Sequence, residues 1–493
     1  MSSLTISAFA CVLISLGFVL NDVELPGLFY VICLASGILI LRDGIDYLRG
    51  RMGSFDPVGI IGLVGVMMFF VSPVLQRSWN YWPFLPDLSQ ADDWMILWAT
   101  LNLLGILIYR TIVHAPFSRA TVAQTGYTFN RRRFKIVIAL ALAFSLLMQL
   151  YVYSKFGGIA GFIATFTERQ SEGLVDAAED PFEGMGLPML FAESFKLLIA
   201  MGVIYLIKGK PWAARNSTLV ILMAIFGVVF LFFGGLRGSR SSTIFALFFA
   251  AGMYSLWIKP IRIKFIVIGA LVASAFLTTY YWYKIAGTDG MLAMFDSSYR
   301  ANFNSARQDA SKYIVARDMG RMDVQVLALK QYYEKDYDFS YGRTYLTAIF
   351  AAIPKSIVPY KPDQITKEKT EIIYGRGSYI PDSPRQTTLV LGQFGEFFIN
   401  FGLIGVFAFW IVLGLVVRRL RMWSYQWQDW DVRRFILPVL TLIPILMLIT
   451  DMNVLLLNMT RYLFFPVFVA LLCIRKRKPV PVLNNGAHHL AVA

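Results

Sequence analysis

The stretch FGGLRGSRSS, residues 233–242, joins two long apolar runs and places two arginines between them. The first run covers about residues 217–235, and the second covers about 243–258. Their lengths are close to the roughly 20 residues that a helix needs to cross the hydrocarbon core of a bilayer. We therefore expect two membrane-spanning helices here, with Arg237 and Arg240 held at the membrane boundary in a short connection.

The composition of the whole chain is typical of a polytopic membrane protein. Of its 493 residues, 57% are hydrophobic and 15% are aromatic, a profile that would leave a soluble domain with large exposed apolar patches. The net charge of +15 does not indicate a nucleic-acid partner, because Lys and Arg of membrane proteins collect in cytoplasmic loops. The three cysteines fall in apolar runs, so we expect neither a disulfide nor a metal site. We also expect no cofactor.

Twelve apolar runs of roughly 14 to 21 residues predict an all-α bundle of about twelve transmembrane helices. The predicted spans are 4–20, 27–41, 57–75, 94–113, 135–153, 187–207, 217–235, 243–258, 265–283, 402–417, 435–450 and 461–474. We divide the chain into spans with short loops (1–283), a large loop region with amphipathic helices and a re-entrant segment (284–401), the last three spans (402–474) and a basic tail (475–493).

Basic residues occur in every second linker between the predicted spans. Two examples are the clusters at 131–135 and 259–264, and the C-terminal tail opens with RKRK at 475–478. The positive-inside rule makes these linkers cytoplasmic. Both termini are then predicted to be cytoplasmic, while the loop region 284–401 and the connection at 233–242 are predicted to face outward.

Two interpretations of the arginine pair stay open. As anchors, Arg237 and Arg240 would only reach the lipid headgroups. As an anion site, they would offer guanidinium groups that match phosphate oxygens in bidentate fashion. Gly234, Gly235 and Gly238 would then allow close backbone approach, and the N-terminus of the following helix would favour the anion.

Five further charged residues lie in or beside the predicted spans. Glu193 and Lys196 are three residues apart, so we expect them to pair along one helix. We expect Asp451 and Arg461 to form a structural pair across the turn between the last two spans. Glu396 lies in an apolar stretch, where a carboxylate is costly to bury unless it is paired or protonated. It is either the partner of a nearby arginine or a general base.

Four stretches, taken in their order along the chain, resemble the O-antigen polymerase family, the membrane polymerases of lipid-linked oligosaccharide repeat units. The stretches are FGGIAGFIATFTERQ (156–170), GLRGSRSS (235–242), IPK…VPYKP (353–362) and GEFFINFGLIG (395–405). The resemblance implies a metal-independent, inverting glycosyl transfer at the periplasmic face of the bacterial inner membrane. The donor would be a growing glycan on undecaprenyl diphosphate and the acceptor a lipid-linked repeat unit. A chain-length regulator would be a further partner.

The charged residues described above would supply parts for that chemistry. Arg237 and Arg240 would stabilise the diphosphate leaving group, and Glu396 would be the general base. Further contacts to the diphosphate or to the sugars are expected from basic residues of the outward-facing segments, namely Arg169, Arg300, Arg307, Arg343, Lys361, Arg376 and Arg385.

Three alternatives to a polymerase stay open at this point. The related O-antigen ligases use a histidine in the large external loop, whereas this chain has no histidine between residues 115 and 487, which favours a polymerase. A flippase or transporter of lipid-linked oligosaccharide would also be polytopic, but such proteins often show inverted repeats that are not evident here. A scaffold for polysaccharide assembly would leave the arginine pair unexplained.

Overall fold

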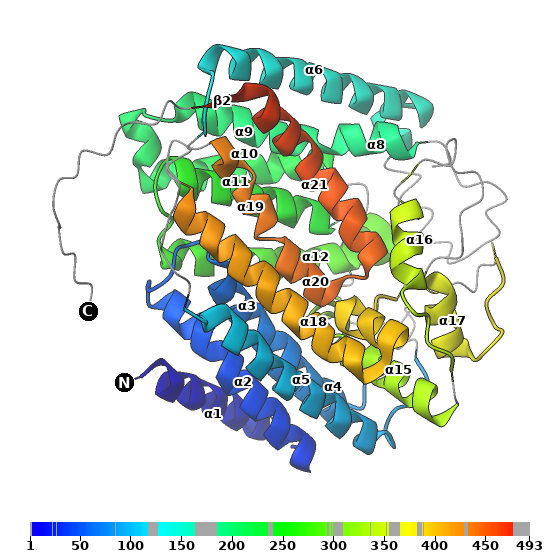
Figure 1. The fold of residues 1–493 in the computed structure, drawn as a ribbon. Helices are drawn as coiled ribbons and strands as arrows, with labels where there is room; N and C mark the ends of the chain where they lie inside the picture. Colours follow the sequence, from blue (N-terminus) through cyan, green and yellow to red (C-terminus); the bar gives the residue numbers. More distant parts are fainter. Residues whose placement is uncertain are drawn as a thin grey trace.

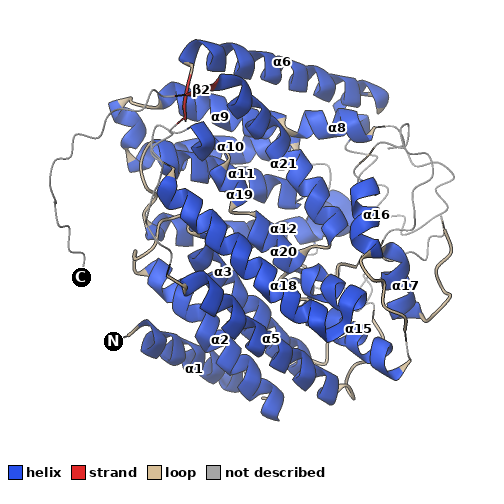
Figure 2. Cartoon of the chain, in the orientation of Figure 1, coloured by secondary structure: helices blue, strands red, loops and turns tan. Residues whose placement is uncertain are grey.

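The computed structural model describes the chain apart from a set of short segments and the C-terminal tail. The residues outside it are 1, 22, 26, 84, 117–126, 163–184, 235–239, 293–294, 297, 299–308, 336, 352, 354–364, 382–386, 388, 428–431 and 477–493. The described residues fold into a bundle that is helical almost throughout (Figures 1 and 2).

Ten helices of the described residues are long and apolar enough to cross a membrane. They are α1 (Ser3–Leu20), α2 (Gly27–Leu48), the continuous α3 (Pro57–Val66), η1 (Met67–Val71) and α4 (Ser72–Ser78), α5 (Asp92–His114), α6 (Arg131–Lys155), α8 (Gly186–Glu193) with α9 (Phe195–Ile207), α10 (Asn216–Phe233), α12 (Ile263–Leu292), α18 (Gly392–Gln426) and α21 (Met452–Cys473). Two shorter apolar helices are α11 (Arg240–Trp257) and α19 (Leu437–Leu440) with α20 (Ile443–Ile449). Each predicted span falls on one of these helices, as expected of an all-α, multi-pass membrane protein.

The remaining described elements are short. They are η2 (Pro211–Ala214), α14 (Ala310–Tyr313), η5 (Ile314–Asp318), α15 (Met322–Glu334), α16 (Arg343–Ala351), α17 (Thr366–Tyr374), η6 (Val432–Phe435), and the strands β1 (Tyr127–Phe129) and β2 (Ile474–Lys476). The strands pair antiparallel, with Thr128 opposite Arg475. This pairing adds a three-residue ribbon that the apolar pattern did not predict.

The basic linkers gather at one end of the bundle. Arg421 Nε lies 3.1 Å from Asp56 Oδ2, and Lys259 Nζ donates to the carbonyl of Ala214 at 3.2 Å. The β1–β2 pair joins the basic linker before α6 to the end of α21. Figure 1 shows α15, α16 and α17, which belong to the predicted outward loop region, at the opposite end. The basic linkers and the predicted outward loop region therefore lie at opposite ends of the bundle, as the alternation of basic linkers along the sequence predicts.

Two clusters of buried apolar side chains hold the helices together. The first joins α1, α2, α3, α5, α15, α18 and α20, and the second joins α6, α9, α10, α11, α19 and α21. Large apolar side chains remain exposed along the outer faces, for example Leu140 and Leu147 of α6 and Leu271 of α12. In a membrane protein these side chains face lipid, so their exposure carries no penalty.

Helix α18 folds back on itself at Gly402. This residue has φ 63° and ψ −148°, a conformation that is open essentially to glycine alone. The ring centroids of Phe394 and Phe409 lie 6.5 Å apart. The ~15 residues between them would span ~22 Å in a straight helix. Residues 392–401 therefore run beside the helix that follows, and only that second part corresponds to the predicted span 402–417.

We expect Gly402→Ala to destabilise the protein by about 1–3 kcal/mol, because a Cβ forces strain at this φ and ψ. The added atom would also lie 3.2 Å from the Phe339 ring. Thermal unfolding of the purified protein measures the effect. Gly269→Ala is the control, since a Cβ at Gly269 meets nothing within 4 Å and alanine favours the helix. Equal unfolding temperatures for both variants would contradict the role of Gly402.

Candidate functional site

Glu396 lies in the first part of α18 and is completely buried. Its Oε1 accepts a hydrogen bond from Thr344 Oγ1 of α16 at 2.7 Å. Its Oε2 accepts from the backbone N–H of Met452 at 2.6 Å and from Gln393 Nε2 at 3.3 Å. The carboxylate therefore lies where α16, α18 and α21 meet, and both of its oxygens have donors.

Asn400 fixes the start of α16 against this carboxylate. It lies one turn after Glu396, and its Nδ2 donates at 2.8 Å both to Thr344 Oγ1 and to the carbonyl of Glu396. Its Oδ1 accepts from the N–H of Gly342 at 2.8 Å. The Thr344 hydroxyl thus receives one hydrogen bond from Asn400 and donates its own proton to Glu396. Glu396 Oε1 therefore accepts the proton of a hydroxyl group.

Asp451 forms a second buried carboxylate directly beside the first, because the residue after it donates to Glu396. Its Oδ2 lies 3.0 Å from Lys369 Nζ of α17. Its Oδ1 accepts from the backbone N–H groups of Leu391 and Gly392 at 2.9 and 3.1 Å. Asp451 therefore ties α17, the start of α18 and the start of α21 together. The predicted pair of Asp451 with Arg461 is wrong, since each residue has another partner.

Arg343, one of the predicted ligand-binding arginines that the structure describes, is the neighbour of Thr344 in this network. It pairs with Glu368 of α17, which also accepts from Ser340 Oγ at 3.0 Å. Burial raises the pKa of the Glu368 carboxyl above its ordinary value, although Arg343 and Ser340 favour the ionised form. The Arg343 side chain is 43% exposed, so part of its guanidinium can meet a ligand.

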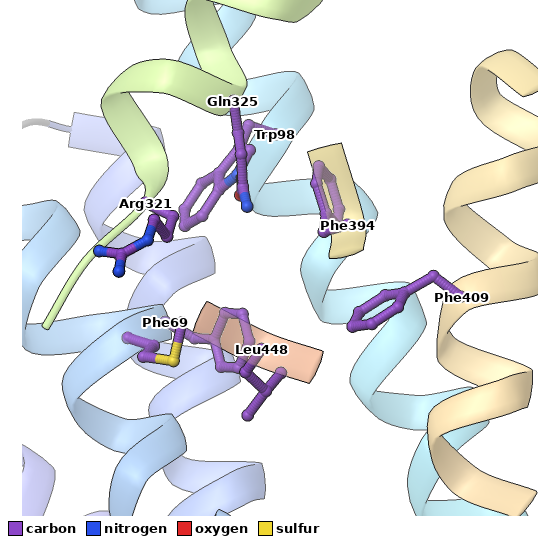
Figure 3. Close-up of a pocket in the computed structure, with 8 residues that line it drawn as sticks. Phe69, Trp98, Arg321, Gln325, Phe394, Phe409 and Leu448 are labelled. Carbon is purple, nitrogen blue, oxygen red and sulfur yellow. Dashed lines mark hydrogen bonds between the residues drawn. The ribbon is translucent and has the colours of Figure 1, made fainter. Parts of the chain in front are cut away.

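A small pocket lies behind this network (Figure 3). Its lining consists of Met68, Phe69, Trp98, Arg321, Gln325, Phe394, Phe409 and Leu448. Gln325 accepts from Trp98 Nε1 at 2.8 Å and donates to the carbonyl of Leu391 at 2.6 Å. The Arg321 guanidinium points away from the rings and donates to the carbonyl of Ile449 at 3.2 Å. These polar groups bind protein atoms, so the pocket supports the backbone that positions Asp451.

A second polar cluster lies among α8, α9, α11 and α21. Arg461 Nε lies 2.6 Å from Glu193 Oε2, and Lys196 Nζ bonds to Ser242 Oγ near the start of α11. Glu193 and Lys196 are both buried. The expected pairing of these two residues along one helix is therefore corrected. A break at Ser194 separates α8 from α9, and each side chain reaches a different helix.

The predicted site residues are placed as follows. Arg240 is the first residue of α11, and its side chain lies outside the described part of the structure. Arg376 forms an ion pair with Asp338 at 2.7 Å in which both side chains are exposed, the kind of pair that contributes little to stability. Several further predictions fall outside the described residues, namely those for Arg169, Arg237, Arg300, Arg307, Lys361 and Arg385.

Sequence reasoning missed most partners of Glu396 and Asp451. Asn400 could have been found, because it lies four residues after Glu396 and therefore on the same helix face. Lys369 stands in the polar run TKEKTE and has no local signal that distinguishes it. Thr344 and Gln393 are uncharged, and only the folded chain shows their role.

The described residues contain no group of three or more His, Cys, Asp and Glu side chains that could hold a metal ion. The arrangement combines two buried carboxylates, Glu396 and Asp451, with two cations near the start of α11, Lys196 and Arg461. Helix α21 connects them, because Met452 contacts Glu396 and Arg461 contacts Glu193. Comparison of the chain with models of protein families, with curated proteins and with solved structures found no match.

Proposed function

We propose that the protein polymerises oligosaccharide repeat units carried on undecaprenyl diphosphate, by metal-independent inverting glycosyl transfer at the periplasmic face of a bacterial inner membrane. The observation that carries this proposal is that α21 contacts a buried carboxylate and a cation-rich cluster in the same half of the bundle. Met452 and Arg461 are separated by ~14 Å along the helix. A sugar and a diphosphate can together span such a distance.

The proposed reaction assigns one task to each end of α21. The acceptor hydroxyl attacks the anomeric carbon of the donor, and its proton passes to Glu396. The bond from that carbon to the diphosphate oxygen breaks, and undecaprenyl diphosphate leaves with its negative charge stabilised by Arg237 and Arg240. In the structure, the Thr344 hydroxyl donates to Glu396 Oε1, which is the atom that would take the proton of the acceptor hydroxyl. The hydroxyl of the acceptor therefore displaces Thr344 when it binds.

The membrane orientation belongs to the same proposal. The end that carries the basic linkers is assigned to the cytoplasm, so that α15, α16 and α17 face the periplasm. Lipid-linked repeat units would then reach the site from the outer leaflet. The basic residues at this end, Arg343 and Arg376 among the described ones, would contact sugars or phosphate.

Incubation of the purified protein with one defined lipid-linked repeat unit tests the activity. A polymerase converts the unit into a ladder of longer glycans on the carrier lipid, resolved by gel electrophoresis or mass spectrometry. Unchanged glycan length in reconstituted vesicles, with a change only in the sidedness of the lipid, would replace the proposal by a flippase or transporter.

We expect Glu396→Gln to abolish chain lengthening without unfolding the protein. Glutamine keeps the shape of the side chain and one acceptor oxygen, for the Met452 N–H, and its NH2 group can donate to Thr344 Oγ1, but it cannot take up a proton. Polymer length and the unfolding temperature are measured together. The control is Glu334→Gln, at an exposed residue that accepts from Trp94 Nε1 at 2.8 Å. Normal polymer from Glu396→Gln would remove Glu396 as the base.

A further inference from the structure

The hydroxyl group of Thr344 is held between two side chains of α18. Its oxygen donates to Glu396 Oε1 at 2.7 Å and accepts from Asn400 Nδ2 at 2.8 Å. Glu396 and Asn400 are completely buried, and Thr344 is 2% exposed. An acceptor atom beside a donor atom fits a hydroxyl, which donates one proton and accepts at two lone pairs. Glu396 and Asn400 therefore form a two-point binding position for a hydroxyl group, the hydroxyl position.

The two side chains of the hydroxyl position are fixed by contacts that do not involve α16. Glu396 Oε2 accepts from the backbone N–H of Met452 on α21 and from Gln393 of α18. Asn400 Nδ2 also donates to the carbonyl of Glu396, one turn earlier in the same helix, at 2.8 Å. Helices α18 and α21 are themselves held by the two large clusters of buried apolar side chains. The hydroxyl position would therefore persist if α16 moved away.

Helix α16 is attached to the bundle more lightly than α18 and α21. None of its described side chains belongs to the two large apolar clusters, and Leu346 and Ile349 are 56% and 55% exposed. The chain enters α16 through Tyr341 and Gly342, which have φ values of 43° and 88°. The first of these is a strained conformation for a residue other than glycine. Few buried apolar contacts favour local opening, so α16 is the element expected to move, with Tyr341–Gly342 as its hinge.

A ligand can reach Glu396 only if a neighbouring element moves, because the carboxylate is completely buried. Moving α18 or α21 would break the hydrogen bonds by which Asp451 joins the starts of these two helices. Moving α16 breaks the two hydrogen bonds of the Thr344 hydroxyl and the ion pair of Arg343 with Glu368. A hydroxyl ligand would then make the two bonds that Thr344 has given up. Movement of α16 is therefore the opening that the ligand itself can compensate.

We propose that Glu396 and Asn400 together bind the acceptor hydroxyl, and that Thr344 occupies their site as an internal competitor until α16 moves away. This inference rests on the proposed function and deepens it, since it names Asn400 as a second residue that binds the acceptor and α16 as the element that controls access. The bound hydroxyl donates to Glu396 Oε1 and accepts from Asn400 Nδ2. Its second lone pair stays free to attack the donor.

Initial rates of chain lengthening test the competition, with a preformed lipid-linked glycan as saturating donor and a defined lipid-linked repeat unit as acceptor. We expect Thr344→Val to lower the KM for the acceptor about fivefold or more without reducing kcat, because valine cannot occupy the hydroxyl position. The matched control is Thr347→Val, since the equally buried Thr347 hydroxyl donates within α16 to the carbonyl of Thr344. Its KM should equal that of the wild type. An unchanged or higher KM for Thr344→Val would overturn the proposal.

A second substitution in the Thr344→Val protein tests Asn400. With the competing hydroxyl gone, Asn400→Leu should raise the KM about tenfold, because the bound acceptor loses a hydrogen bond in a buried site. Asn400 also holds α16 through the N–H of Gly342, which donates to its Oδ1 at 2.8 Å. If this contact were its only role, the substitution would loosen α16 and the KM would stay the same or fall. Either of those results would overturn the role of Asn400.

Hydrogen–deuterium exchange of the wild-type protein tests the movement without any substitution. The N–H of Gly342 donates to a side chain of α18, so its exchange reports the contact between α16 and that helix. We expect a saturating amount of the lipid-linked repeat unit to speed exchange at Gly342 and along α16 about threefold or more. The carrier lipid without its sugars should have no effect. Unchanged or slower exchange with the complete unit would overturn the proposal, and so would equal acceleration by the carrier alone.

The two proposals can fail separately. Wild-type protein in which the unit speeds exchange in α16 but never lengthens a glycan would retain the hydroxyl position and refute the polymerase. Protein that lengthens the glycan with the same KM in the wild type and in Thr344→Val would retain the polymerase and refute the internal competitor.

Discussion

Alanine in place of Arg240 is expected to abolish long polymer while the protein inserts and folds normally. Arg240 begins α11, and Ser242, two residues later, accepts a hydrogen bond from the buried Lys196. Removing one preorganised group that stabilises developing charge typically costs about 100- to 1000-fold in rate. The measurement is the initial rate of chain lengthening by purified protein on a defined lipid-linked unit. The unfolding temperature of the variant, compared with that of wild type, shows that the loss is catalytic.

Two further variants sharpen this experiment. Arg240→Lys should recover little activity, because lysine provides a point charge without the planar fork that matches two phosphate oxygens. Arg51→Ala is the control, since Arg51 is 59% exposed and pairs with Asp46 at the end that carries the basic linkers. It should polymerise like the wild type. Full activity of Arg240→Ala would leave the arginine pair as a membrane anchor.

Replacing Asp451 by alanine is expected to lower the stability of the protein strongly. The carboxylate is completely buried, and it accepts hydrogen bonds from Leu391, Gly392 and Lys369. Its loss leaves the ammonium of Lys369 buried without this partner, a change that costs about 3–5 kcal/mol. We expect a lower unfolding temperature and a lower yield of folded protein. Size-exclusion chromatography after heating measures both.

A double variant separates the effect of the charge from the effect of the packing. Asp451→Asn with Lys369→Met removes both charges and keeps an acceptor for the two backbone N–H groups, so it should recover more than half of the loss. Asp338→Ala removes an exposed carboxylate from an ion pair and should change stability by less than about 0.5 kcal/mol. If Asp451→Ala unfolds at the wild-type temperature, the described pairing does not hold the three helices together.

The apolar pattern was sufficient to predict the helices, because each span is read from local composition. The apolar pattern misses the features that depend on contacts between segments far apart in the sequence. The predicted span 402–417 begins where α18 turns at Gly402, but the helix itself starts ten residues earlier, and residues 392–401 pack against the part that follows Gly402. The β1–β2 pairing joins segments more than three hundred residues apart, and no local pattern reports such a contact.

The candidate site was predictable only in part. Glu396, Glu193 and Lys196 could be singled out because charge is rare in apolar segments. Their partners could not, because spacing along one helix says nothing about which neighbouring helix a side chain meets. Glu193 therefore pairs with Arg461, from a helix far away in the sequence, and Asp451 pairs with Lys369. The wrong predictions all chose a partner that was close in the sequence.

An electron-microscopy map of the protein with bound undecaprenyl diphosphate tests the central claim most directly, namely that the arginine-rich connection holds the departing diphosphate. The account predicts both phosphates beside the start of α11, within reach of Arg240, in the half of the bundle that carries α15, α16 and α17. Phosphates bound at the end that carries the basic linkers, or on the lipid-facing surface away from α11, would contradict it.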